Sequence, residues 1–255
     1  MIEFQIQDGS VICTRHTINP SVMAHEFSIS FKENVKKFDL WLGHQNMIAL
    51  LKEHHNFHSF LDVGAGEGCA TKIMKFLGKD TVSIEPWETR PKYPNSDVFI
   101  PDFRENYMDI KFDRQFDVIW CSHVLEHIKN PNIFLSKIFQ DLKEDGILAL
   151  IVPYNDGDNI EYIVDGHINK YGIGVMIYTL ITAGFNCSDI SINLHGYEMV
   201  VFLKKKSTGL STIGDTTRSF SDLIQFFPDT DQEKRYSGER LSIMIFKKSP
   251  LNWRW

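Results

Sequence analysis

A glycine-rich segment is the part of this sequence whose residue types and spacing most clearly suit chemistry. It runs Phe60-Leu61-Asp62-Val63-Gly64-Ala65-Gly66-Glu67-Gly68. The apolar start predicts a buried strand, and the glycines predict a tight turn that lets a ligand approach the backbone where a helix begins. The dinucleotide-binding pattern GxGxxG would need glycine at position 69, where this chain has Cys69. An acid two residues before the first glycine instead favours a ligand that carries a positive charge.

A second acid follows one strand later. Glu85 ends the strand-like run Val82-Ser83-Ile84-Glu85. A carboxylate at that place can accept hydrogen bonds from both hydroxyls of a ribose. The alternative interpretation is a solvated glutamate at a strand end. Because the glycine-rich segment lies upstream, we favour the ribose role.

Three histidines and an acid form the second group with chemical potential. His123, Glu126 and His127 would share one face if their segment is helical, since they are spaced by three and four residues. Two imidazoles and a carboxylate so placed suit a divalent cation, and His167 is expected to reach the same place from a later loop. Alternatively, the segment only packs and hydrogen-bonds, and either His123 or His167 takes a proton from an acceptor hydroxyl.

Alternating strands and helices must position these residues. Such alternation predicts an α/β fold, namely a Rossmann-like, doubly wound and mostly parallel seven-stranded sheet with helices on both faces. The expected strands are 60–63, 81–84, 97–100, 116–121, 146–152, 189–194 and 198–204, and the expected helices include 69–77, 131–142 and 174–183.

The two ends of the chain carry additional elements. We expect a β-hairpin over residues 2–13 that turns at Asp8-Gly9, and a helix from Phe38 to His55. A short apolar helix at 220–227 and a last strand at 241–246 are expected after the core. The predicted division is an N-terminal hairpin and substrate-side segment at 1–37, a core domain at 38–205 and a C-terminal extension at 206–255.

Four motifs in Phe60–Pro153 now identify a family resemblance: FLDVGAGEG, SIEPW, FDVIWCSHVLEHIKNP and LKEDGILALIVP. In this order they resemble the class I S-adenosylmethionine (SAM)-dependent methyltransferases, especially the branch related to ubiquinone-biosynthesis O-methyltransferases. The resemblance implies SAM as the cofactor. It places Asp102 at the adenine amine with Phe103 beside the ring, and Cys121 and Ser122 near the sulfonium. It also implies that the following residues hold the methionine and ribose parts: Asp62, Gly64, Ala65, Gly66, Gly68, Glu85 and Pro86.

The histidine–glutamate group has a resemblance of its own. His123, Glu126, His127 and His167 resemble the metal site of small-RNA 3′-end 2′-O-methyltransferases, and the Glu-x-x-Glu-His run of some ubiquinone O-methyltransferases. Those families place an acid where this chain has His123. The substitution weakens the case for magnesium and favours a softer ion.

The composition narrows the setting in which this chain is expected to act. Its four cysteines (Cys13, Cys69, Cys121 and Cys187) are scattered without a CxxC pair, which fits reduced thiols in the cytoplasm. We expect neither a signal peptide nor a membrane span, because no basic region precedes an apolar stretch and no apolar run is long enough. The formal net charge of −6 and the lack of a basic stripe disfavour a nucleic-acid substrate.

These observations together predict an enzyme that methylates oxygen or nitrogen of a small molecule. The acceptor is expected to be a sugar, a nucleotide-linked or a phosphorylated intermediate of cell-surface polysaccharide biosynthesis, by family analogy. One alternative is a metal-dependent RNA 2′-O-methyltransferase, and another is a non-catalytic interaction module that kept the fold. The N-terminal hairpin and the tail with Trp253 and Trp255 allow a homodimer contact, although packing onto the parent domain is the simpler interpretation.

Overall fold

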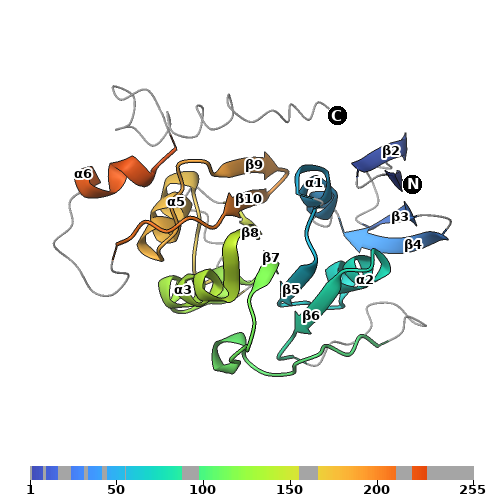
Figure 1. The fold of residues 1–255 in the computed structure, drawn as a ribbon, viewed down its shortest axis with the longest axis horizontal. Helices are drawn as coiled ribbons and strands as arrows, with labels where there is room; N and C mark the ends of the chain where they lie inside the picture. Colours follow the sequence, from blue (N-terminus) through green and yellow to red (C-terminus); the bar gives the residue numbers. More distant parts are fainter. Residues whose placement is uncertain are drawn as a thin grey trace. The chain divides into compact units, whose positions relative to one another are not determined.

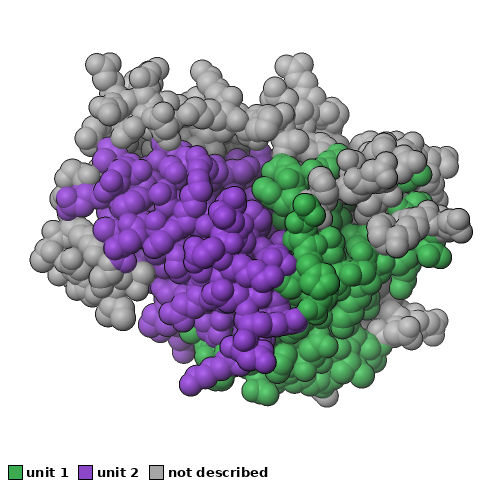
Figure 2. Space-filling view, viewed as in Figure 1, with its two compact units in different colours: residues 1–110 green, residues 111–255 purple. Residues whose placement is uncertain are grey.

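The structure is a computed structural model in which the chain forms two compact units, Met1–Ile110 and Lys111–Trp255 (Figure 2). Each unit is described by itself. The described residues are 2–7, 10–16, 24–31, 34–41, 45–54, 56–87, 98–154, 166–210 and 220–228.

The first unit begins with a four-stranded sheet in the order β2-β1-β3-β4 (Figure 1). Its strands are β1 (Ile2–Gln7), β2 (Ser10–His16), β3 (Ala24–Phe31) and β4 (Asn34–Trp41). The antiparallel pairing of β1 with β2 confirms the predicted hairpin, although its turn residues lie outside the described part. β3 adds in parallel to β1 and pairs antiparallel with β4.

The predicted helix from Phe38 to His55 was wrong in its first part. Residues up to Trp41 belong to strand β4, and helix α1 spans only Gln45–Glu53. The strand also crosses the expected boundary between residues 37 and 38. Partner strands account for the difference, because β4 completes its hydrogen bonds against β3 and local apolar spacing does not report such pairing.

The second part of this unit carries the glycine-rich segment on a parallel strand pair. β5 (Ser59–Val63) pairs in parallel with β6 (Asp80–Ile84), and helix α2 (Cys69–Phe76) connects them and packs against both (Figure 1). All five residues of β5 are buried, which explains its apolar sequence. The helix ends before Gly78, whose φ of 75° lets the chain turn back.

The strand expected at 97–100 does not form among the residues described there. Residues 98–100 have no strand conformation, and the side chains of Val98 and Ile100 are exposed. The chain instead meets the sheet three residues later, where Phe103 forms an isolated parallel bridge with Ile84. A short 3-10 turn, η2 (Tyr107–Asp109), follows.

The second unit is built on a mixed strand arrangement. β7 (Phe116–Ser122) pairs in parallel with β8 (Leu142–Pro153), β8 pairs antiparallel with β10 (Glu198–Lys204), and β10 pairs antiparallel with β9 (Ser191–His195). The hairpin of β9 and β10 confirms the last two predicted core strands. Helices α3 (Pro131–Asp141) and α5 (Ile173–Thr182) pack together, and α3 packs on β8 (Figure 1).

Local sequence signals explain much of this second unit. Pro131 occupies the first turn of α3, as expected, because its missing N–H is not needed there. Asn130 precedes it but does not cap the helix with its side chain. The core is dense with fully buried aromatic residues such as Trp120, Phe116, Phe134 and Phe185.

The described residues confirm an α/β fold and correct its expected strand count. They hold six strands of the predicted core rather than seven. Two of the pairings described above are parallel, and the two antiparallel ones involve the expected hairpin strand β10, so the mostly parallel character of the sheet stays a prediction. Near the C-terminus, α6 (Phe220–Leu223) and η4 (Ile224–Phe226) confirm the short helix, while the predicted last strand and both tail tryptophans lie outside the described residues. No helix among the described residues is long and apolar enough to cross a membrane.

Candidate functional site

The glycine-rich turn adopts the conformation that its composition predicts. Gly64, Gly66 and Gly68 all have positive φ, at 75°, 53° and 74°. Side chains other than hydrogen are strained in this region, so the three glycines permit the turn between β5 and α2. The N–H groups of Gly64 and Ala65 both donate to the carbonyl of Ile84 at 2.9 Å. These bonds fix the turn to the end of β6.

Glu85 completes this attachment with its side chain. Its Oε2 accepts a hydrogen bond of 2.8 Å from the N–H of Gly66, and its Oε1 accepts one of 3.0 Å from the N–H of Trp87. The residue is buried, whereas the adjacent Pro86 is exposed. A buried carboxylate is therefore held at the carboxyl ends of β5 and β6, directly beside the glycine turn. The ribose role predicted for Glu85 and Pro86 stays a prediction.

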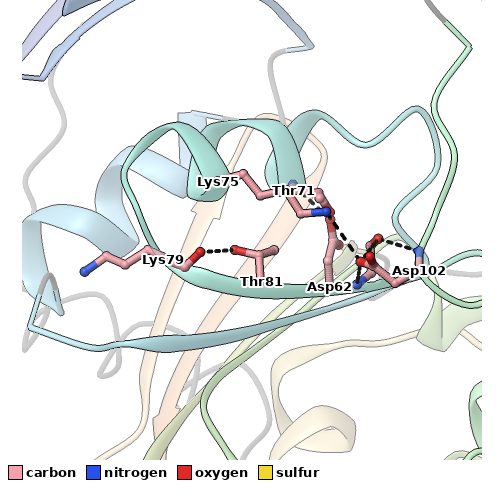
Figure 3. Close-up of polar contacts among 7 residues, drawn as sticks. Asp62, Thr71, Lys75, Lys79, Thr81 and Asp102 are labelled. Atoms are coloured by element: carbon pink, nitrogen blue, oxygen red, sulfur yellow. Dashed lines mark hydrogen bonds and ion pairs between the residues drawn. The ribbon is translucent and has the colours of Figure 1, made fainter.

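Asp62 serves the architecture of the same turn. Its carboxylate accepts hydrogen bonds from both the N–H and the hydroxyl of Thr71, at 3.1 and 2.6 Å, and so ties β5 to the first turn of α2 (Figure 3). Burial raises the pKa of Asp62 to about 7, against the opposing effect of the Thr71 hydrogen bonds. The side chain can therefore change its protonation state near neutral pH, and its contact with the cofactor stays a prediction.

Asp102 lies on the neighbouring segment and is bound to β6. Its Oδ2 accepts hydrogen bonds from the N–H and the hydroxyl of Ser83, at 2.9 and 2.7 Å, and forms an ion pair of 3.6 Å with Lys75 (Figure 3). The N–H of Phe103 donates to the carbonyl of Ser83. Asp102 and Phe103 thus reach the end of β6 next to Glu85, and their predicted contacts with adenine remain a prediction.

Phe99 is a residue that sequence reasoning missed. A Cβ atom added to Gly68 would overlap the ring of Phe99, so the ring lies directly against the glycine backbone at the start of α2. The ammonium group of Lys72 lies 5.7 Å from the centroid of the same ring. Gly68 is therefore required by a close approach of Phe99 as well as by its φ. The GxGxG spacing signals a close approach but does not identify which group makes it.

The second unit holds the other predicted residues. Cys121 is buried near the end of β7, and Ser122 at its last position is half-buried. The chain then turns sharply at His123, whose φ of 55° is unusual for a residue other than glycine. An α-helix over 123–127, on which the shared face of these residues depended, does not form, and a 3-10 turn, η3 (Leu125–His127), follows.

This turn places the ring of His123 between two acids. Its Nε2 lies 2.9 Å from Oε1 of Glu198, and its Nδ1 lies 3.2 Å from Oε1 of Glu126. Burial on its own would lower the pKa of His123, but the two carboxylates outweigh it and raise the pKa to about 9. Both ring nitrogens thus face acids, and the cluster of possible ligands among the described residues forms without His123. The metal-ligand role of His123 stays a prediction.

Glu198 was not foreseen from the sequence. It is the first residue of β10, and it lies 75 positions from its partner His123. Only the pairing of β10 with β8 brings it to the turn after β7, and no local pattern reports that proximity.

The remaining three predicted ligands converge. One ligand atom each from Glu126, His127 and His167 lies within 4.8 Å of the others. Glu126 is fully buried; its Oε1 lies 3.2 Å from Nδ1 of His123, but among the described residues neither carboxylate oxygen has a contact that meets hydrogen-bond geometry. A bound cation would add to this incomplete compensation of a buried carboxylate. This set of one carboxylate and two imidazoles fits a borderline divalent ion better than magnesium.

Backbone contacts explain how His167 reaches Glu126. The N–H groups of Ile168 and Asn169 both donate to the carbonyl of Glu126, at 2.9 and 3.0 Å. Nδ1 of His127 lies 3.1 Å from the carbonyl of Gly166. Since a carbonyl only accepts, Nδ1 donates in this contact, and Nε2 of His127 lies on the side of Glu126, 4.0 Å from its Oε1. Metal-binding histidines are commonly oriented in this way by a carbonyl behind them.

Sequence comparison gives a family match and distant relatives. The profile of a methyltransferase domain family matches residues 36–181. A ubiquinone biosynthesis O-methyltransferase of Rickettsia bellii (strain OSU 85-389) is 26% identical over 117 residues, which cover 43% of this chain and 48% of that protein. An uncharacterized methyltransferase of Staphylococcus carnosus is 23% identical over 187 residues, covering 71% of this chain and 89% of the relative. The chain spans about half the length of the ubiquinone-related proteins that it matches.

Structural comparison finds partial overlaps. The crystal structure of 1,6-didemethyltoxoflavin-N1-methyltransferase from Burkholderia thailandensis, with bound 1,6-didemethyltoxoflavin and S-adenosylhomocysteine, aligns with a TM-score of 0.49 and 18% identity. That alignment covers 62% of this chain and 76% of the other.

Proposed function

Because this chain belongs to the family of methyltransferase domains, we propose that it transfers the methyl group of SAM to oxygen or nitrogen of a small molecule. One observation carries the proposal: the buried carboxylate of Glu85 holds the N–H of Gly66 at the turn between β5 and α2. The hydrogen bond holds two features side by side. One is a glycine turn whose backbone a ligand can approach, and the other is a carboxylate that can accept hydrogen bonds from ribose hydroxyls.

The first unit is proposed to hold the cofactor. The turn at Gly64, Ala65, Gly66 and Gly68 would contact its methionine part, with Asp62 beneath. An ionised Asp62 would attract the ammonium group, and its raised pKa implies that cofactor binding expels a proton near neutral pH. Glu85 would accept hydrogen bonds from the ribose hydroxyls.

Methyl transfer requires that the acceptor atom be positioned against the methyl carbon and that the acceptor lose one proton. The acceptor atom forms a bond to the methyl carbon while the bond from carbon to sulfur breaks, and S-adenosylhomocysteine leaves as the neutral thioether. The proton of the acceptor must pass to a base. Of the two candidates, His167 is preferred, since both ring nitrogens of His123 lie against carboxylates.

A divalent cation on Glu126, His127 and His167 is the proposed alternative to a proton-accepting His167. Such an ion would supply a positive charge that lowers the pKa of a bound hydroxyl group. His167 would then serve as a ligand rather than as a base. The two roles exclude each other, so removal of the cation distinguishes them.

The acceptor class follows from charge and family analogy. We propose a sugar, nucleotide-linked or phosphorylated intermediate of polysaccharide biosynthesis, acted on in the cytoplasm. The net charge of −6 disfavours RNA as a substrate. The convergence of Glu126, His127 and His167 supports RNA only through the resemblance of these residues to the metal site of small-RNA 2′-O-methyltransferases. Salt-dependent RNA binding would therefore support the alternative of a metal-dependent RNA 2′-O-methyltransferase. A homodimer is a further prediction.

Calorimetric titration with S-adenosylhomocysteine tests the proposed function, with NAD as the control ligand. We expect saturable binding of S-adenosylhomocysteine and none of NAD, because the third glycine of the dinucleotide pattern is replaced by Cys69. Binding of NAD alone, or of neither compound, would contradict the proposal. The second result would favour a non-catalytic module.

A further inference from the structure

The second unit contains an acid that no part of the proposed reaction uses. Glu198 is buried, with 4% of its side chain exposed, and stands at the first position of β10. An isolated carboxylate in such a place is costly, so its retention needs a compensating partner. The ion pair with His123 provides that partner.

We propose that Glu198 is a positioning residue, which acts through His123 to orient the carboxylate of Glu126 in the cation site. The inference rests on the cation site proposed above. It assigns His123 a new role: instead of binding the ion, the imidazole connects two buried acids. Glu198 contacts Nε2 of the imidazole, and Glu126 contacts Nδ1.

The geometry of His123 supports this assignment. Its backbone N–H continues the strand ladder by donating to the carbonyl of Ile151 at 2.9 Å, while its φ of 55° reverses the chain immediately afterwards. A residue in this strained region persists only where its surroundings hold it in place. Here the Nε2 contact of 2.9 Å with Glu198 holds the ring, and Nδ1 is thereby presented to Oε1 of Glu126 at 3.2 Å.

The surroundings of Glu126 make this orientation matter. Its side chain is fully buried and its Oε1 faces Nδ1 of His123 at 3.2 Å, so the position of the imidazole sets the direction of the carboxylate. Since the backbone carbonyl of Glu126 already binds Ile168 and Asn169, the residue is fixed at both its main chain and its side chain. Loss of Glu198 would free the ring of His123 and with it the carboxylate.

Cobalt(II) titration of the full chain tests the proposal, because cobalt reports both affinity and ligand geometry through its absorption spectrum. Glu198→Gln keeps the shape and a hydrogen-bond acceptor but removes the charge. We expect it to weaken cobalt binding by about 10- to 100-fold, as for other residues behind metal ligands, and to alter the spectrum. Glu144→Gln, at a glutamate with 80% exposure on the same unit, is the matched control and should bind as the unaltered chain does.

A double-variant cycle separates positioning from general support of the fold. If Glu198 acts through His123, then Glu198→Gln should add nothing once His123→Gln is present. If the single variant does not fold, the double variant, which removes both members of the His123–Glu198 contact, still permits the cobalt measurement. Additive losses, or unchanged cobalt binding by Glu198→Gln, would overturn the proposal.

The same samples distinguish this inference from the proposed function. Affinity for S-adenosylhomocysteine should stay within about twofold in every variant, since none of these residues belongs to the glycine turn. If the unaltered chain binds S-adenosylhomocysteine but no cobalt, the positioning role fails and the transfer function stands. If cobalt behaves as expected and S-adenosylhomocysteine does not bind, the positioning role stands and the transfer function fails.

Discussion

The backbone N–H of Gly66 donates a hydrogen bond of 2.8 Å to Oε2 of Glu85, across 19 positions of sequence. This bond closes the glycine turn after β5 onto the end of β6. The same carboxylate also receives the N–H of Trp87. The buried carboxylate of Glu85 therefore fixes the shape of the glycine turn and lies directly beside that turn.

Glu85→Gln should weaken binding of S-adenosylhomocysteine by at least about tenfold, because one amide oxygen cannot replace two carboxylate oxygens as acceptors. The NH₂ group of the new glutamine side chain would also face the backbone N–H of Gly66 or Trp87, and two donors cannot form a hydrogen bond. Calorimetry measures the affinity, and Glu105→Gln provides an exposed glutamate of the same unit as a control. Equal affinity in both variants would remove Glu85 from the site.

Asp62 should make folding stability depend on pH in an unusual direction. The pKa of about 7 in the folded chain lies above the unfolded value of about 3.9, so the folded state binds more protons between these limits. The contribution of Asp62 is fully present below about pH 4 and is lost as pH rises through about 7. Over this window the loss is on the order of a few kcal/mol.

Urea unfolding at a series of pH values checks this dependence against Asp62→Asn. The variant should lack the decline from pH 4 to 7, whereas Asp109→Asn, an exposed position in η2, should retain it. Parallel curves for the unaltered chain and Asp62→Asn would show that the carboxyl is ionised throughout.

Two glycines of the turn should respond differently to alanine. Gly66 has open space around its position, so Gly66→Ala should cost only the strain of a positive φ, about 1–2 kcal/mol of the free energy of unfolding. Gly68→Ala adds an overlap with the ring of Phe99 and should cost more. Phe99→Ala in the same chain should recover part of that extra loss. Equal costs, with no recovery, would argue against the close approach of Phe99.

The cation site predicts stabilisation by added metal. Cobalt(II) at about 100 times its dissociation constant should raise the free energy of unfolding by about 2.7 kcal/mol, and EDTA should reverse the effect. His167→Ala should abolish the increase, while His58→Ala, at an exposed histidine of the other unit, should preserve it. An increase in the free energy of unfolding that persists in His167→Ala would show that the ion binds elsewhere.

The elements that sequence predicted well are those governed by local rules. The three glycines of the turn require positive φ wherever they stand in such a loop, and Pro131 marks the first turn of α3. His167 lies near Glu126 and His127, and its role as a ligand or a base stays a prediction. The family resemblance predicted the order of strands and helices, and in that order the segments with Glu126 and His167 follow neighbouring strands.

The missed features depend on partners far along the chain. β3 carries an apolar alternation at Phe27, Ile29 and Phe31, but its existence becomes clear only beside β1 and β4. Glu198 reaches His123 through the pairing of β10 with β8. A helix that begins at His123 does not form, because the residue adopts a left-handed turn; of the two acids that contact its ring, Glu198 lies too far along the chain for local spacing to report.

Hydrogen–deuterium exchange with and without S-adenosylhomocysteine tests the central claim most directly, because it locates the ligand as well as detecting it. The account predicts slower exchange in peptides that cover residues 62–69 and 83–87, where Gly66 meets Glu85. NAD should leave these peptides unchanged. Binding of S-adenosylhomocysteine without protection of either segment would contradict the assignment of the glycine turn as the cofactor site.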